Sequence, residues 1–314
     1  MRCLLFAYSE IGVVGMETLL ELGETVCGVI THADHPGERR WWRSVEELPI
    51  AKNIPVTSPE DPNTPDVLAW AKDRRPDIVF SFYFRKMLKR PLLDLGRLGA
   101  YNLHGSLLPK FRGRAPVNWA ILEGAAETGL TLHAMVEKPD AGDIIAQEAV
   151  PILEHENARE VFEKLVPAAR RILTSVVPLL REGRAPRRAQ DESQATYFGA
   201  RKPEDGRIDW TQSARRVHNL VRALTRPYPG AFTFLGGKKL FIWKGAAAVG
   251  QVAGQPGQVF GPLADGVAVV TGQGLYVVKE VQWEGESVQP AREVLQDIAV
   301  IPIDNTSSLS SPRS

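Results

Sequence analysis

The sequence predicts an α/β protein in which a Rossmann-like, mostly parallel sheet is followed by a small β-barrel domain. Residues 3–7 and 25–31 are apolar runs of strand length, and residues 12–22 between them carry apolar side chains at helical spacing. This order predicts a right-handed βαβ unit and a parallel sheet. Beyond residue 230, short β-type runs alternate with glycine-rich turns, which is typical of a small barrel.

The chain length of 314 residues favours two domains. We expect a catalytic domain at 1–190, a linker at 191–204, a C-terminal domain at 205–304 and a flexible tail at 305–314. The linker follows an arginine-rich stretch that is poor in apolar residues, and the tail is polar and serine-rich.

Local signals predict the remaining elements in order. Thr64, Pro65 and Asp66 form a helix start, because Thr caps, Pro fits the first turn and Asp faces the positive end of the dipole. That helix ends near residue 74. Strands are expected at 77–82, around Asn102, at 129–136, 144–151, 232–235, 240–243, 258–260, 267–270 and 275–283; helices are expected at 116–123, 157–181 and 214–225. Pro167 and Pro178 should kink or break the helix at 157–181.

Charge and cysteine content exclude several classes of protein. The chain has 38 Lys and Arg against 37 Asp and Glu, so no global field attracts nucleic acid or an anionic membrane. Its 2 cysteines lack a C-x-x-C spacing and form neither a disulfide framework nor a zinc site. Because no apolar run reaches signal or transmembrane length, we expect a cytoplasmic enzyme.

Nicotinamide and metal cofactors are not expected. The motif that contains Gly12 and Gly15 lacks the first glycine of the dinucleotide-binding pattern G-x-G-x-x-G. The next strand ends in Thr31 rather than in an acidic residue that could hold a ribose. We therefore expect the two glycines to allow close helix–sheet packing. The group His32, Asp34 and His35 has the residue types of a metal site. Nothing supplies a well-spaced further ligand, so we expect no metal.

The stretch around residue 104 carries the most specific chemistry. Asn102 and His104 are two apart on a predicted strand and therefore project to one face. An amide N–H can hold a developing oxyanion and an imidazole can move a proton, so the pair suits attack on a carbonyl. Asp140, in a Pro/Gly-rich turn, could orient the imidazole and raise its pKa. The alternative is a capping Asn and a core His; His133 is expected to be a core or cross-strand side chain.

These residues resemble the signature of the 10-formyltetrahydrofolate-dependent formyltransferases. The shared features are Asn102, His104, the Ser-Leu-Leu-Pro loop at 106–109 and Asp140, and the resemblance covers nearly the whole chain. The run 102–119, with Arg114, is most similar to the branch acting on UDP-4-amino-4-deoxy-L-arabinose, in lipid A modification and polymyxin resistance. The Ser-Phe-Tyr-Phe-Arg run at 81–85 and Phe-Ala-Tyr at 6–8 resemble the same branch.

The resemblance implies a formyltransferase fold with an OB-like C-terminal domain and assigns roles to residues. Asn102 would stabilise the oxyanion, His104 would move the proton, and Asp140 would keep His104 basic and oriented. The loop after Thr31 would be a mobile lid near the donor. The residues implied in binding 10-formyltetrahydrofolate are Lys86, Met87, Leu88, Arg114, Val136, Glu137, Lys138, Pro139 and Asp140.

The resemblance also implies the partners. The acceptor would be a nucleotide-linked amino sugar whose pyrophosphate is held by Arg114 and Arg201, although either arginine could be a surface ion pair instead. A homo-oligomer and a fusion to a decarboxylase domain both stay open.

Two alternative functions were weighed. The first is methionyl-tRNA formyltransferase, but residues 205–314 hold eleven Lys and Arg against nine Asp and Glu, which is poor for neutralising phosphates. The second is a folate-binding module without catalysis. The presence together of Asn102, His104 and Asp140 disfavours it.

Overall fold

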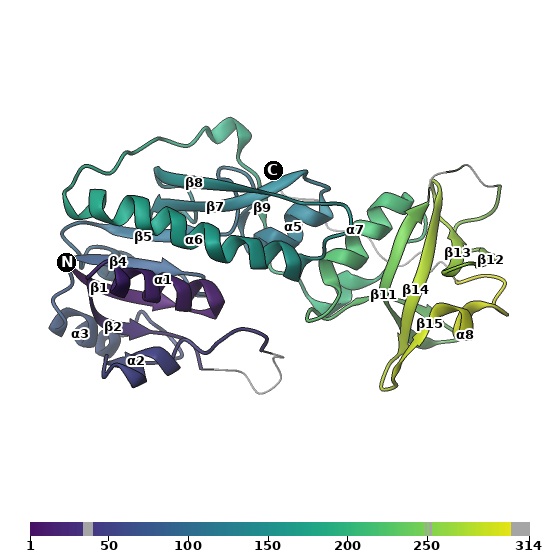
Figure 1. Ribbon diagram of the computed structural model, residues 1–314, viewed down its shortest axis with the longest axis horizontal. Coiled ribbons are helices and arrows are strands. Elements are labelled where there is room, and N and C mark those ends of the chain that lie inside the picture. Colours follow the sequence, from purple (N-terminus) through teal and green to yellow (C-terminus); the bar gives the residue numbers. More distant parts are fainter. Residues whose placement is uncertain (34–39, 249, 251–252, 303–314) are drawn as a thin grey trace. The chain divides into compact units, whose positions relative to one another are not determined.

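The computed structural model describes residues 1–33, 40–248, 250 and 253–302, and the chain divides into two compact units (Figure 1). Unit 1 comprises Met1–Pro116, Glu127–Pro151 and Phe162–Phe198, and unit 2 comprises Val117–Ala126, Ile152–Val161 and Gly199–Ser314. The tail expected at 305–314, and Asp34 and His35, lie outside the described residues.

The strands and helices have the following bounds. The strands are β1 Arg2–Ala7, β2 Thr25–Ile30, β3 Val56–Thr57, β4 Ile78–Phe82, β5 Ala100–His104, β6 Arg112–Gly113, β7 Glu127–Ala134, β8 Ile144–Pro151, β9 Tyr197–Phe198, β10 Ala231–Leu235, β11 Lys238–Ala248, β12 Val259–Leu263, β13 Gly266–Val270, β14 Leu275–Trp283 and β15 Val288–Pro290. The helices are α1 Ser9–Glu21, α2 Glu47–Ala51, α3 Pro65–Asp73, α4 Arg90–Leu93, α5 Pro116–Leu122, α6 Ala158–Arg181, α7 Ala214–Leu224 and α8 Ala291–Leu295, with short 3-10 turns at Glu192–Gln194 and Pro203–Gly206.

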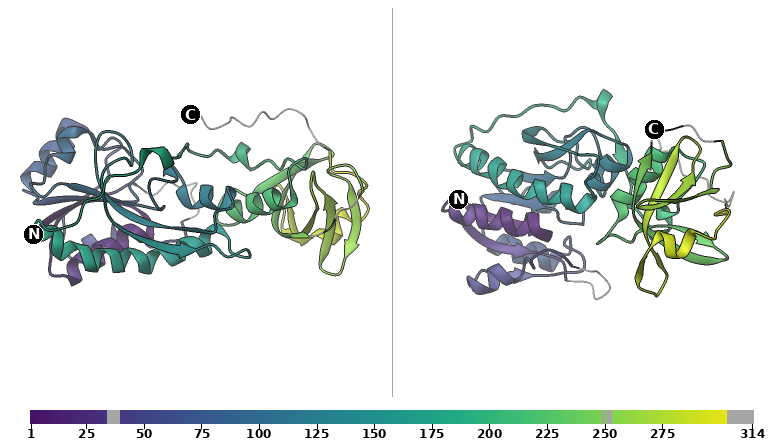
Figure 2. Two further views of the ribbon diagram at one scale, coloured as in Figure 1. Left: turned by 90° about the horizontal axis from the view of Figure 1, so that it is seen from above. Right: turned by 45° about the vertical axis from the view of Figure 1, so that its right-hand side comes forward.

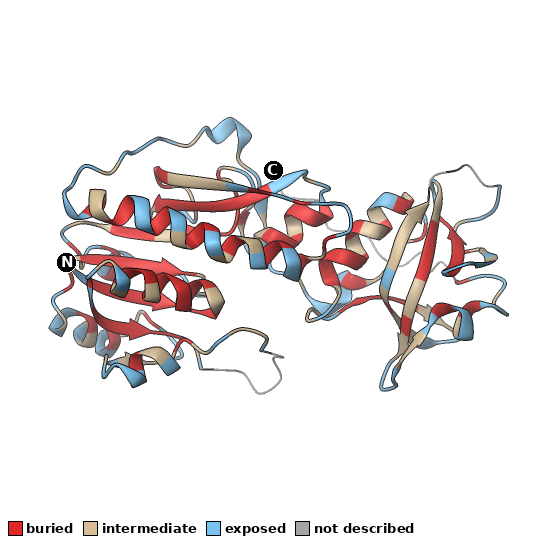
Figure 3. Cartoon of the chain, in the orientation of Figure 1, coloured by how far each residue is buried: buried red, intermediate tan, exposed pale blue. Residues whose placement is uncertain are grey.

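Unit 1 is built on a seven-stranded sheet in the order β3-β2-β1-β4-β5-β7-β8. The first five strands are parallel, whereas β5 pairs with β7, and β7 with β8, in antiparallel fashion. The mostly parallel sheet predicted from the βαβ pattern is therefore confirmed. Helices cover both faces, which is why the strands β1, β2 and β4 are almost wholly buried (Figure 3).

Alternating side chains of the central strands serve the two faces of this sheet. Leu4, Phe6 and Val79 belong to a buried cluster with residues of α3 and α4. On the face of α1, a Cβ added at Gly15 would lie 2.6 Å from the Phe82 ring. Gly15 therefore permits close helix–sheet packing, as the sequence suggested.

At the start of α3, Thr64 caps the helix by accepting a hydrogen bond from the Val67 N–H at 3.4 Å.

Helix α6 runs along the α1 side of unit 1, where Arg170 pairs with Glu17 and Glu21 of α1 (Figure 1). A break at Pro167 or Pro178, one of the two outcomes expected, does not occur, because α6 is one helix of 24 residues. Each internal proline costs about 3 kcal/mol. Burial of each large apolar side chain returns about 1.5–3 kcal/mol, and α6 buries Val161, Leu165, Ile172, Leu173, Val176, Val177 and Leu180.

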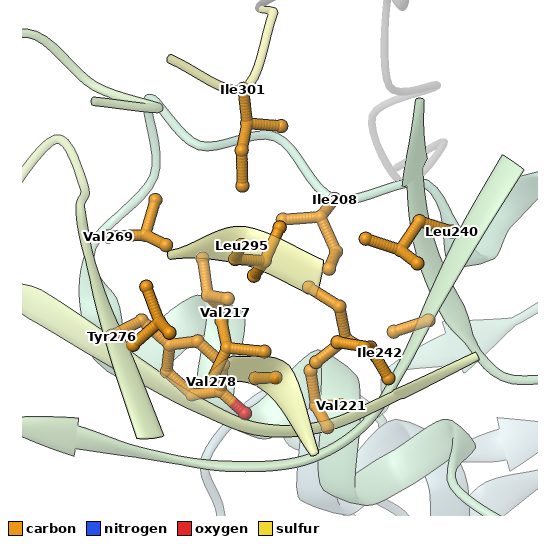
Figure 4. Close-up of a cluster of buried hydrophobic side chains, with 14 of the residues drawn as sticks. Ile208, Val217, Val221, Leu240, Ile242, Val269, Tyr276, Val278, Leu295 and Ile301 are labelled. Carbon is orange, nitrogen blue, oxygen red and sulfur yellow. The ribbon is translucent and has the colours of Figure 1, made fainter. Parts of the chain in front are cut away.

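Unit 2 contains a six-stranded antiparallel sheet in the order β10-β11-β14-β13-β12, with β15 added beside β14. Figure 2 shows this sheet from two further sides. Its core gathers Val217 and Val221 of α7 against Ile242, Tyr276 and Val278 of the sheet (Figure 4). The predicted fold class, an α/β sheet followed by a small β domain, is confirmed. The sequence did not predict β15 and α8.

The segment 191–198, within the expected linker, is part of unit 1. Its strand β9 pairs in parallel with β6, matching Arg112 with Tyr197 and Gly113 with Phe198. From Gly199 onward the chain belongs to unit 2.

Candidate active site

The site lies in unit 1 at the carboxyl ends of the central strands. Strand β1 lies between β2 and β4, so the strand order reverses there, and such a switch point is where open α/β sheets bind ligands. Strand β5 lies in register beside β4, with Ser81 opposite Asn102 and Phe82 opposite Leu103. His104 is the last residue of β5 and therefore lies at this edge.

Asn102 is held by a histidine of the neighbouring strand. The antiparallel register of β5 and β7 places His133 opposite Asn102, and Nδ2 of Asn102 lies 3.1 Å from Nε2 of His133. Nδ1 of His133 lies 2.9 Å from the carbonyl of Ala134, which can only accept, so Nδ1 carries the proton. Nε2 then accepts one N–H of the Asn102 amide. Among the residues that the structure describes, the other N–H of this amide has no partner, so it is available for a substrate oxygen.

His104 is fixed by the loop that follows it. Nε2 lies 2.9 Å from the carbonyl of Phe111, so this nitrogen donates its proton to the carbonyl. Ser106 also donates to backbone carbonyls of this loop, at Lys110 at 2.6 Å and Phe111 at 3.4 Å. The nitrogen left to accept a proton is Nδ1 of His104.

Asp140 lies between the two imidazoles. Its Oδ1 is 3.5 Å from Nδ1 of His104 and 3.5 Å from Nε2 of His133. Its Oδ2 accepts a hydrogen bond of 2.9 Å from the Gly113 N–H. The Asp140 backbone has φ +54°, a left-handed conformation that Asp tolerates better than most residues.

These contacts set the protonation of the pair. Burial raises the pKa of Asp140, but the Gly113 N–H and the attraction between the carboxylate and the imidazolium forms of His104 and His133 outweigh it and hold the pKa well below its ordinary value. Burial lowers the pKa of His104, while the Asp140 carboxylate and the Phe111 carbonyl oppose the shift. At neutral pH, Asp140 is therefore assigned as a carboxylate and His104 as a neutral imidazole. A proton arriving at Nδ1 would face that carboxylate, so the arrangement suits a general base.

Contacts with the segment 190–198 hold the loop at 111–114 in place. Backbone bonds join the Arg112 N–H to the Thr196 carbonyl at 2.9 Å and the Arg114 N–H to the Phe198 carbonyl at 3.0 Å. The fully buried Arg112 side chain donates to Glu192 at 2.6 Å and to Gln190 at 2.7 Å. Neither Arg112 nor Gln190 was predicted from the sequence, since the polar composition around 190 carries no local signal and the partners of Arg112 lie far away in the chain.

The residues expected to bind folate follow β4 and precede Asp140. Leu88 is buried in the unit 1 core, while Lys86 and Met87 are exposed. Asn63 fixes this segment, because its Nδ2 donates to the Met87 carbonyl at 3.0 Å and its Oδ1 accepts from the Lys89 N–H at 2.8 Å.

The residues 136–139 form an exposed turn that leads to Asp140. Val136 is 45% exposed, an unusual environment for an apolar side chain. Lys138 donates to Glu192 at 2.9 Å. Glu137 and Pro139 are exposed.

The two arginines expected to bind substrate differ in environment. Arg114 is exposed, and within the described residues it is held by the backbone bond to Phe198. In unit 2, Arg201 lies with its guanidinium 4.8 Å from the centre of the Trp119 ring and donates to the Asp205 carbonyl at 2.7 Å.

A group of aromatic side chains surrounds His32 at the same edge of the sheet. The His32 ring stacks on Phe84 at 4.1 Å and meets Tyr8 edge-on at 5.2 Å. Its Nε2 accepts a hydrogen bond of 2.9 Å from the Arg85 N–H. Within the residues that the structure describes, no group of three or more His, Cys, Asp or Glu side chains is arranged to hold a metal ion.

Comparison with known proteins defines the class. The family model described as formyl transferase matches residues 21–177, and the one described as formyl transferase, C-terminal domain matches residues 201–298. The chain belongs to the formyltransferase family and is a formyltransferase enzyme. No helix among the described residues has the length and apolar character needed to cross a membrane.

Three solved structures show the same fold. The sugar 3N-formyl transferase WlaRD, studied with dTDP and 5-N-formyl-THF, has a TM-score of 0.67 and 19% identity over 91% of this chain and 98% of that chain. The N-formyltransferase from Helicobacter canadensis, in complex with folinic acid and dTDP-3-aminofucose, has a TM-score of 0.68 and 19% identity over 88% of this chain and 97% of that chain. Methionyl-tRNA formyltransferase from Clostridium thermocellum has a TM-score of 0.54 and 17% identity over 80% and 94%.

Proposed function

We propose that this enzyme transfers a formyl group from 10-formyltetrahydrofolate to the amine of a nucleotide-linked amino sugar. One observation carries the proposal: the proton-accepting Nδ1 of His104 lies 3.5 Å from the Asp140 carboxylate, on the strand that also presents Asn102. The solved structures that bind formylated folates together with dTDP or a dTDP-sugar support both substrate classes.

The folate supplies an activated formyl carbon, so the protein needs neither metal nor nicotinamide for this step. When the acceptor amine attacks that carbon, negative charge develops on the formyl oxygen. The free N–H of Asn102 donates to this oxygen, and His133 holds the amide in place.

His104 then manages the proton. The attacking nitrogen loses a proton to Nδ1 of His104, and Asp140 stabilises the imidazolium. When the C–N bond to the folate breaks, His104 returns the proton to the departing nitrogen. The products are an N-formyl sugar and tetrahydrofolate, and no group is oxidised or reduced.

The residues expected at the folate are compatible with this reaction. The segments 86–88 and 136–139 are largely exposed, and the second of them immediately precedes Asp140. A folate bound against these segments would present its formyl group to the catalytic residues.

We further propose UDP-4-amino-4-deoxy-L-arabinose as the acceptor, in lipid A modification and polymyxin resistance. Arg114 supports this branch, since its exposed guanidinium follows Gly113, whose N–H binds Asp140. A planar guanidinium suits two oxygens of a pyrophosphate.

The test is an incubation of the protein and 10-formyltetrahydrofolate with UDP-4-amino-4-deoxy-L-arabinose, dTDP-3-aminofucose or methionyl-tRNA. Mass spectrometry should show a gain of one formyl group on the UDP-sugar. Formylation of the dTDP-sugar instead would overturn the acceptor but keep the reaction class. Formylation of methionyl-tRNA, with binding that weakens steeply as salt rises, would replace the proposal by the tRNA enzyme.

A further inference from the structure

Gln190 joins the two segments that hold His104 and Asp140. Its Nε2 donates to the backbone carbonyls of Asp140 and Gly142, each at 2.7 Å. Its Oε1 accepts from Nε of Arg112 at 3.1 Å and from Nη2 of the same guanidinium at 2.7 Å. Both N–H groups and the carbonyl oxygen of this one side chain are thus engaged.

The neighbours of Arg112 make the bonds that orient the catalytic pair. The Phe111 carbonyl accepts from Nε2 of His104 at 2.9 Å, and the Gly113 N–H donates to Oδ2 of Asp140 at 2.9 Å. Gln190 therefore links the backbone of Asp140 to the residue that lies between these two contacts.

The Asp140 turn needs such a link. Asp140 has φ +54°, and conformations of this kind cost energy and persist where surrounding contacts enforce them. The preceding residues 136–139 are exposed and provide little packing. Two donors from one planar amide, placed on carbonyls two residues apart, restrain the turn on both sides of Ala141. Backbone bonds of 2.8 and 2.9 Å between Ile144 and Arg188 anchor the segment that carries Gln190.

We propose that Gln190 is a positioning residue for the formyl transfer, acting on His104 through Asp140. This inference rests on the proposed function, in which Asp140 supports His104 as the proton carrier. Gln190 itself touches no reacting atom.

Two variants separate its two roles. Gln190→Glu retains an acceptor for Arg112 but loses both donors to the Asp140 turn. Gln190→Leu loses the donors and the acceptor. Gln194→Leu is the matched control, because Gln194 is exposed and its Nε2 donates to Asp191 at 2.8 Å, away from the pair.

The kinetic test uses 10-formyltetrahydrofolate with UDP-4-amino-4-deoxy-L-arabinose and with dTDP-3-aminofucose. Since displacement by about 1 Å can cost up to about a hundredfold in rate, both Gln190 variants should lose kcat by about tenfold or more. KM for the folate should stay within about twofold, and Gln194→Leu should match the wild type. In an Asp140→Asn background, Gln190→Leu should cost less than about threefold further. A further tenfold loss there would overturn the inference, because Gln190 would then act independently of Asp140.

A measurement without an acceptor completes the test. Nuclear magnetic resonance of the histidine rings gives the titration of His104, assigned by loss of its signal in His104→Ala. Gln190→Leu, which adds no charge, should move this titration in the same direction as Asp140→Asn. If Asp140→Asn alone moves it, the role of Gln190 is wrong while the proposed function stands. If Asp140→Asn leaves both kcat and the titration unchanged, the proposed pairing itself fails. Circular dichroism confirms folding, and Gln190→Glu decides the matter should Gln190→Leu not fold.

Discussion

Oδ1 of Asp140 lies 3.5 Å from Nδ1 of His104, on the side of the ring that is left without a proton when Nε2 donates to the Phe111 carbonyl. The same oxygen is 3.5 Å from Nε2 of His133, which accepts a hydrogen bond from the side-chain amide of Asn102. One carboxylate is therefore adjacent both to the proposed proton acceptor, His104, and to His133, which holds the proposed oxyanion donor. This geometry determines what each substitution should do.

Removal of either member of the pair should abolish most of the turnover. We expect His104→Ala and Asp140→Asn each to lower kcat by about a hundredfold or more, since general acid–base catalysis contributes about 10²–10⁴-fold. Steady-state kinetics measures the loss, and circular dichroism checks that folding is intact. The exposed His155→Ala is the control for loss of a histidine. Near-wild-type turnover in His104→Ala would contradict the assignment.

The oxyanion donor should depend on its neighbour. Asn102→Ala should lower kcat by about a hundredfold, as for the loss of an oxyanion donor elsewhere. His133→Phe leaves a ring of similar size but no acceptor for the amide, so a smaller loss of about tenfold is expected. Rates of the two single variants and of the double variant decide the point. If His133→Phe costs as much in the Asn102→Ala background as it does alone, the two residues do not act together.

The pH dependence should follow the titration of His104. Burial lowers its pKa below the ordinary value of 6.5, so the imidazole is neutral and able to accept a proton at neutral pH. As pH falls through the lowered pKa, the ring becomes protonated and kcat should decline, with the midpoint below pH 6.5. In Asp140→Asn the opposing carboxylate is lost, so the midpoint should move to still lower pH. A midpoint in the wild type above pH 7 would show that the carboxylate outweighs burial.

Arg114 should contribute to acceptor binding. If its guanidinium holds the pyrophosphate, Arg114→Ala should lower kcat/KM for the nucleotide sugar by more than the ~0–1 kcal/mol expected of an exposed ion pair. Arg114→Lys should recover only part, because an ammonium cannot match the planar fork. Arg90→Ala provides the comparison, since Arg90 makes an exposed pair with Asp94 at 2.7 Å. Wild-type efficiency in Arg114→Ala would remove the structural support for the UDP-sugar branch.

Local sequence determined most elements of the fold and the strand that carries two of the proposed catalytic residues. The βαβ pattern predicted the parallel sheet, and the Thr64 cap marked the start of α3. The two-residue spacing of Asn102 and His104 placed both on one strand. Such features depend on side chains close in the chain, so a single sequence reveals them. At the prolines of α6 the same reasoning allowed a break that does not occur, because the cost of a proline is local whereas the burial that outweighs it comes from the rest of unit 1.

The tertiary structure decided which distant residues support the catalytic ones. His133 meets Asn102 through the register of two antiparallel strands, 31 positions apart in the chain. Gln190 reaches Arg112 across 78 positions and Asp140 across 50. The sequence around 190 suggested the approach to a linker, because its polar residues carry no local pattern. The partners of Gln190 are backbone carbonyls and a buried guanidinium that other segments supply, and only the folded chain brings these groups within hydrogen-bonding distance.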